Sequence, residues 1–273
     1  MITFDHLSKH FGTHRAVDDL SFTVPPGEVT GFLGPNGAGK STSLRMACSL
    51  TRPTAGHVTI DGRSFAEFPN PARVVGVMLD ASAQHAGRTG RETLRLAAMA
   101  THMPRRRVDE LLELVGLREA AGKRVGRYSL GMRQRLGLAV ALMGDPRILI
   151  LDEPANGLDP AGIRWIRSLL DDFARSGGTV LLSSHLLGEI QAVADRVVVI
   201  DKGKLRQVGP VAELLRGSTT WVRTPDPERL ADALAAHGLD AHTDGDGRLL
   251  AEADPEIIAA IAQAAGVLVT GID

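Results

Sequence analysis

Two patterns of apolar residues divide the chain into short strands and amphipathic helices. Residues 2–4 and 21–24 alternate between apolar and polar positions, which predicts strands with one buried face. A short apolar run at 29–33 predicts another strand, and the fully apolar run at 148–151 predicts one in the middle of a parallel sheet. Further strands are expected at 57–60, 74–79, 179–182 and 197–200.

Helical spacing appears between these strands. Residues 104–115 carry apolar side chains at i, i+3, i+4 and i+7, which form one stripe along a helix, with Pro104 expected at its first position. The stripe consists of Val108, Leu111, Leu112 and Val115. Further helices are expected at 41–50, 91–101, 161–176 and 186–194, and another begins at residue 129. The alternation of strands and helices predicts an α/β sheet covered by helices.

Composition shifts near residues 217–220, and the pattern beyond them differs. The predicted order there is a strand, a helix, a hairpin, a helix and a strand, at 221–223, 227–237, around a turn at 244–247, 255–264 and 267–270. This βαββαβ order is the ferredoxin-like split pattern. We therefore expect two domains, residues 1–217 and a small α+β domain at residues 218–273.

Length, charge and cysteine content narrow the class of protein. The 273 residues suffice for one large domain and a small one, and the net charge of −1 provides no positive field for nucleic acid. A single cysteine, Cys48, cannot form an intrachain disulfide, and we interpret it as a small buried residue. The sequence shows no signal peptide, and its apolar runs are too short to span a bilayer. Work at a membrane would therefore require another chain that crosses it.

The stretch at 34–42 satisfies the phosphate-binding pattern G-x-x-x-x-G-K-[ST] between a predicted strand and a predicted helix. Its glycines permit positive φ angles and close approach to an anion, and the helix that follows directs its N–H groups at the same charge. Lys40 would neutralise the β- and γ-phosphates, and the Ser41 hydroxyl would be a ligand of Mg²⁺. We therefore predict binding of a nucleoside triphosphate. The residues concerned are Gly34, Pro35, Asn36, Gly37, Ala38, Gly39, Lys40, Ser41 and Thr42.

Two adjacent acids follow the apolar strand at 148–151. Asp152 at the end of that strand could reach a Mg²⁺ ion held by Ser41, because Mg²⁺ prefers oxygen ligands. Glu153, one residue later, is placed to orient and polarise a water for in-line attack on the γ-phosphate. Phe11, upstream of the phosphate-binding stretch, is either a hydrophobic turn residue or a ring that stacks on adenine.

Residues 128–135, Tyr-Ser-Leu-Gly-Met-Arg-Gln-Arg, resemble the signature sequence of ABC-transporter ATPases. Residues 156–159 resemble the D-loop of that family, residues 183–185 resemble its switch-histidine segment, and Phe11 falls at its adenine-stacking position. The resemblance covers about residues 1–215. It implies ATP and Mg²⁺ as cofactors, and a P-loop NTPase (RecA-like) core with an antiparallel β subdomain and a helical subdomain at about 88–140.

The same resemblance implies an assembly of several chains. In this family two ATPase domains pair head to tail with two ATP molecules between them, so Ser129 and Gly131 would contact the γ-phosphate in trans. His185 would contact it in cis. The partners would be a second ATPase subunit, identical or different, and a separate transmembrane permease. The chain would then lie in the cytoplasm against the inner face of the cell membrane.

One position departs from the family pattern. The resemblance implies, after the strand at 74–79, a glutamine that touches Mg²⁺ or water and senses the permease. Asp80 occupies this place, and Gln84 follows four residues later. A carboxylate can be a ligand of Mg²⁺ but lacks the donor of an amide, so Asp80 is either a metal ligand or a turn residue.

The signature variant and the small C-terminal unit most resemble ATPase subunits of bacterial drug and lantibiotic exporters. We therefore expect ATP hydrolysis that powers export of a small molecule or peptide. One alternative is a non-transport ABC ATPase acting on ribosomes or DNA, but such chains usually carry two ATPase domains or a long coiled-coil insertion. Another alternative is an importer ATPase, which would share every catalytic residue.

Overall fold

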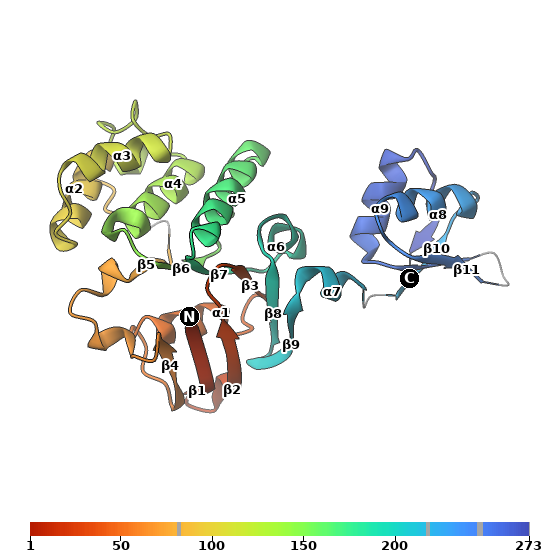
Figure 1. The fold of residues 1–273 in the computed structure, drawn as a ribbon, viewed down its shortest axis with the longest axis horizontal. Coiled ribbons are helices and arrows are strands. Elements are labelled where there is room, and N and C mark those ends of the chain that lie inside the picture. The colour runs from red at the N-terminus through yellow and green to blue at the C-terminus, as the bar shows by residue number, and fades with distance from the viewer. Residues whose placement is uncertain (81–82, 217–218, 245–247, 273) are drawn as a thin grey trace. The chain divides into compact units, whose positions relative to one another are not determined.

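The computed structural model describes residues 1–80, 83–216, 219–244 and 248–272. The chain forms two compact units, Met1–Val208 and Gly209–Asp273, which are considered separately (Figure 1). None of the helices found in the described ranges combines the length and the apolar character needed to cross a membrane.

A sheet built largely from parallel strands forms the centre of the first unit. In the described residues its strands are β5 (Val75–Met78), β6 (Ile148–Asp152), β7 (Thr179–Ser184), β3 (Val29–Leu33), β8 (Arg196–Asp201) and β9 (Lys204–Pro210), in that spatial order. Parallel pairing joins β5 to β6, β6 to β7, and β3 to both β7 and β8. The apolar run at 148–151 is buried between two parallel neighbours, as its sequence predicts. Neither β9 nor the short helix α7 (Val211–Arg216) that follows it is predicted from the sequence.

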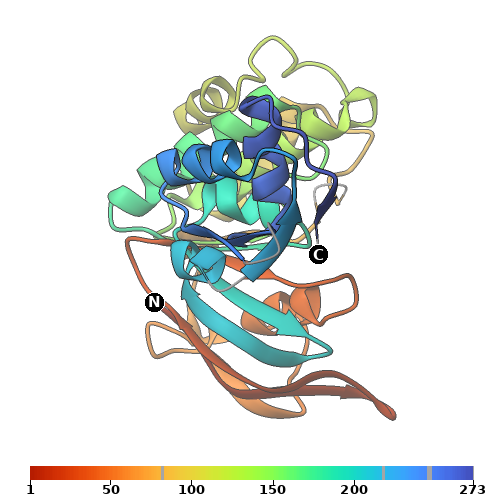
Figure 2. The ribbon, with the colours of Figure 1, turned by 90° about the vertical axis from the view of Figure 1, so that its right-hand side faces the viewer.

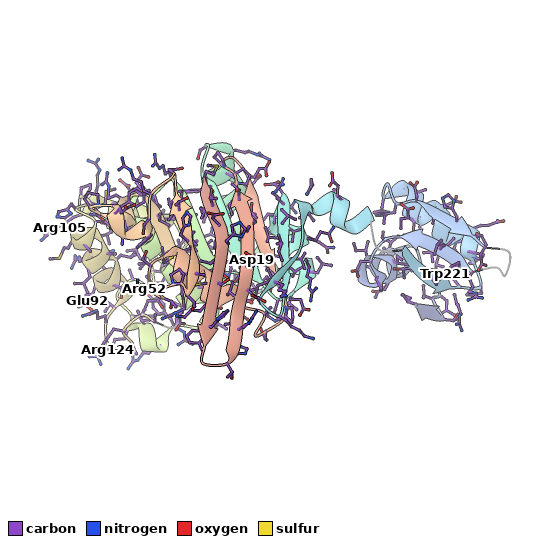
Figure 3. All side chains as sticks on the ribbon, turned by 90° about the horizontal axis from the view of Figure 1, so that it is seen from below. Asp19, Arg52, Glu92, Arg105, Arg124 and Trp221 are labelled. Atoms are coloured by element: carbon purple, nitrogen blue, oxygen red, sulfur yellow. The ribbon has the colours of Figure 1, made fainter. Side chains whose placement is uncertain are left out.

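A second, antiparallel sheet is built from β2 (His14–Val24), β1 (Ile2–Phe11) and β4 (Ala55–Ile60). The first two strands are much longer than the segments 2–4 and 21–24 predicted from alternation. The reason is local: His6 and Asp19 have φ of 46° and 56°, and the register shifts beside them interrupt the alternating pattern. Asp19 is labelled on this sheet in Figure 3.

Helices cover the two sheets and form a layer of their own. The helix after the phosphate-binding stretch, α1 (Lys40–Ala47), contacts β2, β4 and β6 and so lies between the sheets. The helices α5 (Pro160–Arg175) and α6 (Leu187–Val193) contact β3 and β7. The helices α2 (Gly90–Ala100), α3 (Arg106–Leu114) and α4 (Leu130–Ala141) pack together, at the end of the unit opposite the antiparallel sheet (Figures 1 and 2). Short 3₁₀ helices span Phe65–Glu67, Pro71–Arg73, Val125–Arg127 and Leu142–Gly144.

The predicted apolar stripe of α3 is buried. Val108, Leu111, Leu112 and Val115 are all 1% exposed or less. The helix itself begins at Arg106, so the placement of Pro104 at the first helical position was wrong by two residues. Arg105 caps α3 in a helical conformation without a side-chain hydrogen bond, which gives the sequence no capping signal at this end.

The second unit has the predicted βαββαβ order. Its elements are β10 (Thr219–Arg223), α8 (Pro227–Ala236), β11 (Ala241–Thr243), β12 (Leu249–Glu252), α9 (Pro255–Ala264) and β13 (Gly271–Ile272), with the sheet order β11-β12-β10-β13. The last strand lies later than the segment 267–270 expected for it, because Val267 is buried in the core of the unit and only Gly271 and Ile272 pair with β10. The predicted turn at 244–247 lies largely outside the described residues.

Gly76 in β5 marks a close contact between the parallel sheet and α4. A Cβ at this position would lie 2.3 Å from the carbonyl oxygen of Ala141, a backbone atom that cannot move aside without shifting the helix. We expect Gly76→Ala to lower the free energy of unfolding of the first unit by about 1–3 kcal/mol. Urea unfolding in a Trp221→Phe background, followed by Trp165 fluorescence, measures this change.

Gly122→Ala is the matched control. Apart from its chain neighbours, no described residue comes within 4 Å of a Cβ at residue 122, and its backbone is outside the left-handed region. Its unfolding midpoint should equal that of the parent or exceed it slightly. Equal midpoints for both variants would contradict the packing described at Gly76.

Candidate active site

The carboxyl ends of three neighbouring strands meet at one edge of the parallel sheet. β7 lies between β6 and β3, and Asp152 pairs in register with Ser183. Segments that follow parallel strands gather at a common edge. Because the phosphate loop (residues 34–42) follows β3, Glu153 follows β6 and His185 follows β7, the topology brings all three together.

The phosphate loop adopts the conformation that its glycines allow. Gly37 and Gly39 have φ of 82° and 104°, in the left-handed region that favours glycine. A Cβ on Gly39 would also lie 2.4 Å from the carbonyl oxygen of Ala16. α1 begins directly at Lys40, and within the described residues no side-chain hydrogen bond caps its N-terminus. Its first backbone N–H groups are therefore available to an anion.

A cavity of about 510 Å³ opens beside this loop. It is lined by Phe11, His14, Ala16, Asn36, Gly37, Gly39, Lys40, Ser41, Thr42 and Glu153. The structure thus gathers most of the predicted nucleotide-binding residues with Glu153, the predicted catalytic acid. Gly34, Pro35 and Ala38 lie outside this lining. The first two still contribute, because their carbonyl oxygens accept hydrogen bonds from the ammonium group of Lys40.

Lys40 is buried at the base of the cavity, with 5% of its surface exposed. Its Nζ donates to the carbonyl oxygen of Gly34 at 2.6 Å and to that of Pro35 at 3.3 Å. Glu153 Oε1 lies 3.8 Å from the same nitrogen. Burial lowers the pKa of Lys40, and the negative charges of Glu153 and Asp152 partly oppose that shift. The ammonium is therefore held in place by carbonyl oxygens and one carboxylate.

Glu153 is the residue that connects the three segments. Its Oε2 lies 2.9 Å from Nδ1 of His185, and its Oε1 faces Lys40. Its backbone has a φ of 49°, which is rare for a residue with a side chain. This conformation turns the chain directly after β6, so that the carboxylate lines the cavity while the preceding Asp152 completes the strand.

Ser183 has a role that the sequence analysis missed. This fully buried residue donates its hydroxyl hydrogen to Asp152 Oδ1 and accepts the backbone N–H of Glu153 at 3.1 Å. One hydroxyl therefore fixes both acids of the pair. A signal was present in the sequence, since Ser183 directly follows the strand predicted at 179–182 and precedes Ser184 and His185. The role of Ser183 depends on β7 lying next to β6 in the sheet, and this strand order was not predicted from the sequence.

Ser129 and Gly131 lie elsewhere in the same chain. Ser129 is exposed and caps α4, with its hydroxyl accepting the backbone N–H of Met132 at 3.2 Å. A Cβ on Gly131 would lie 3.4 Å from Leu158, so the start of α4 packs on the segment 156–159. Neither residue is among those lining the cavity in the described parts of the chain.

Asp80 lies on a different surface. It is exposed at the end of β5 and lines a groove of about 650 Å³ between β5 and the helices α2 and α4. Gln84 lines the same groove, together with apolar side chains that include Val77 and Leu96. The structure does not bring Asp80 into the lining of the phosphate cavity, and its assignment as a metal ligand stays a prediction.

Phe11 lies at the rim of the phosphate cavity with 55% of its surface exposed. The ammonium group of Lys9 lies 4.9 Å from the centre of its ring. A cation at this distance is attracted to the face of an aromatic ring. The Phe11 ring therefore contacts a cation and also exposes surface at the cavity. A flat group in the cavity could stack on that exposed surface.

Two parts of the sequence match known protein families. The sequence matches the ABC transporter family over residues 17–156, and a domain of unknown function over residues 218–272. The uncharacterized ABC transporter ATP-binding protein YhcH of Bacillus subtilis (strain 168) is 39% identical over 264 residues, which cover 94% of this chain and 87% of that protein.

A relative with an assigned role is similarly close. The bacitracin transport ATP-binding protein BcrA of Bacillus licheniformis is 38% identical over 250 residues, covering 88% of this chain and 81% of BcrA. Among solved structures, an ATP-binding subunit of an ABC transporter superposes with a TM-score of 0.71 at 28% identity, covering 78% of this chain and 91% of that one. The chain therefore belongs to the ATP-binding proteins of the ABC transporter family, and it is an ATPase.

Proposed function

We propose that this ATPase powers the export of a small molecule or peptide through a separate membrane permease. The observation that carries the hydrolytic part is the Glu153 carboxylate, which faces Lys40 in the phosphate cavity and is hydrogen-bonded to His185. Transport of a peptide-like compound is supported by the 38% identity with a bacitracin transport protein over most of both chains.

The residues around the cavity have distinct roles in this proposal. The triphosphate binds the N–H groups of the phosphate loop, and its charge takes the place beside Lys40 that Glu153 and two carbonyl oxygens now share. Glu153 is then free to orient a water for attack on the γ-phosphate, and His185 contacts that phosphate from the same chain. Phe11 stacks on adenine at the rim.

The oxygen donors present are suitable for Mg²⁺. Ser41 lines the cavity. The negative charge of Asp152 acts to raise the pKa of Lys40 at the base of the cavity, against the effect of burial, so Asp152 also lies near the phosphate site. Both are hard ligands of the kind that Mg²⁺ accepts alongside phosphate oxygens and water. When bound, the ion neutralises charge that develops on the phosphates. Ser183 keeps the Asp152 carboxylate oriented through its hydroxyl.

A second ATPase chain completes the site in this proposal. Ser129 and Gly131 do not line the cavity of their own chain, while the start of α4 is exposed at Ser129. The N-terminus of a twelve-residue helix attracts anions. We therefore assign Ser129 and Gly131 to the γ-phosphate bound by the partner chain, which is either a second copy or a related subunit.

The permease contacts the groove that contains Asp80. This groove exposes apolar side chains of α2 beside charged and amide groups, a composition typical of protein contacts. Docking there would hold the chain in the cytoplasm at the inner face of the membrane. The net charge of −1 gives no support to a role on nucleic acid.

Substitution of the catalytic acid tests the hydrolytic assignment. Glu153→Gln keeps the shape of the side chain but removes the base, so we expect ATP binding with loss of turnover and accumulation of an ATP-bound dimer. Single-turnover hydrolysis and size-exclusion chromatography with ATP measure both effects. Lys40→Ala should instead weaken ATP binding itself. Normal turnover in Glu153→Gln would rule out the role given to this residue.

Substitution of Asp80 separates a role in communication with the permease from a role as a metal ligand. If the residue serves communication with the permease, Asp80→Gln should change basal hydrolysis by the isolated chain only a few-fold, since it lines the groove and not the phosphate cavity. Asp152→Asn should abolish Mg²⁺-dependent hydrolysis in the same assay. An equal collapse in Asp80→Gln would make Asp80 a metal ligand.

A further inference from the structure

A glutamine in α4 is hydrogen-bonded to the loop that carries the catalytic acid. Gln134 is 7% exposed, and its Nε2 donates to the carbonyl oxygen of Glu153 at 3.3 Å and to that of Asn156 at 3.1 Å. The backbone N–H of Asn156 also donates to the Glu153 carbonyl at 3.2 Å. Gln134 therefore spans both ends of the turn that begins at Glu153.

The orientation of this amide follows from its partners. Both neighbouring groups are carbonyl oxygens, which accept hydrogen bonds only, so the side chain must present its NH₂ group to them. The other end, Oε1, is buried and has no hydrogen-bond partner within the described residues. A buried acceptor without a partner is unfavourable. The contribution of Gln134 to this site therefore lies in its two N–H donors.

Glu153 requires such support because of its backbone. With a φ of 49° it occupies a conformation that a residue with a Cβ rarely adopts, and surrounding contacts must hold it there. Ser183 binds its backbone N–H, and Gln134 binds its carbonyl oxygen. The peptide groups on either side of the Glu153 Cα are thus fixed, which fixes the direction of its carboxylate.

We propose that Gln134 is a positioning residue for catalysis, holding the Glu153 carboxylate in line with the phosphate cavity through two hydrogen bonds to the backbone of residues 153–156. The residue lies on α4 five residues after Ser129, so the helix that serves the partner's nucleotide also supports the acid of its own chain. This inference rests on the hydrolytic role and the paired assembly proposed above.

Gln134→Met tests the positioning role in the whole chain. It keeps the volume of the side chain and removes both donors. We expect kcat to fall by about tenfold to a hundredfold, since a misplacement of the order of 1 Å has such an effect. The Kd for ATP should stay within about twofold of the parent's, because Gln134 does not line the cavity. A weakened Kd with unchanged kcat would overturn the proposal.

Gln191→Met is the matched control. It makes the same chemical change at a half-buried glutamine of α6 whose Nε2 has no hydrogen-bond partner in the described parts of the chain. Its kcat and Kd should equal those of the parent. If Gln134→Met does not fold, Gln134→Leu removes the same donors with less demand on space, and the same expectations apply.

Mixed dimers distinguish positioning of Glu153 from a general loss of structure. Chains with two different affinity tags are co-expressed and purified through both, with Glu153→Gln silencing one of the two sites. When Gln134→Met and Glu153→Gln share one chain, the active site takes Glu153 from the unchanged partner, and its rate should equal that of the Glu153→Gln/wild-type dimer. When they lie on different chains, the active site uses the Glu153 of the chain that carries Gln134→Met, and its rate should fall.

Each remaining outcome has a definite meaning. An equal fall in both mixed dimers, or a fall only when the substitutions share a chain, would contradict positioning of Glu153 in its own chain. Failure to recover any doubly tagged dimer would instead contradict pairing between two copies of this chain. In that case the kcat and Kd of homogeneous Gln134→Met still decide the role of Gln134.

Discussion

The backbone turn at Glu153 is the constraint on which the rest of the site depends. β6 must end with Asp152 in the sheet, and the next residue must turn its carboxylate towards the phosphate loop, which requires a φ of 49°. Ser183 from β7 and Gln134 from α4 hold this conformation from opposite sides. The catalytic acid therefore depends on the neighbouring strand and on the helical layer, and each of these elements is fixed by its own packing.

The same turn brings α4, which begins within the signature sequence, into contact with the segment 156–159. Gly157 has a φ of 74°, and a Cβ there would lie 2.1 Å from Leu130, so the start of α4 rests against this segment. α4 is in turn packed against β5, where Gly76 allows close approach to Ala141. The groove with Asp80 lies along the same helix. A displacement of α4 would thus reach the surface proposed for the permease, the signature residues and the support of Glu153.

The features predicted correctly from the sequence are those whose chemistry is local. The phosphate loop, the acids after an apolar strand and the helix begun by Ser129 are contiguous patterns, and the strands and helices around them form as expected. The length of β1 and β2 was missed because bulges at His6 and Asp19 break the alternation. Ser183 and Gln134 were missed as functional residues because their roles arise from contacts with residues 31 and 19 positions away, which only the strand order and helix packing define.

The central claim is that one chain binds the triphosphate but obtains Ser129 from a partner to hydrolyse it. Intermolecular complementation tests this directly, by mixing a Ser129→Arg chain with a Glu153→Gln chain, each with little activity alone. In a dimer of the two, one site combines the intact Glu153 of the first chain with the intact Ser129 of the second. The account predicts that ATPase activity appears on mixing and rises with the concentration of either variant. A mixture no more active than its separate components would contradict a site shared between two copies of this chain.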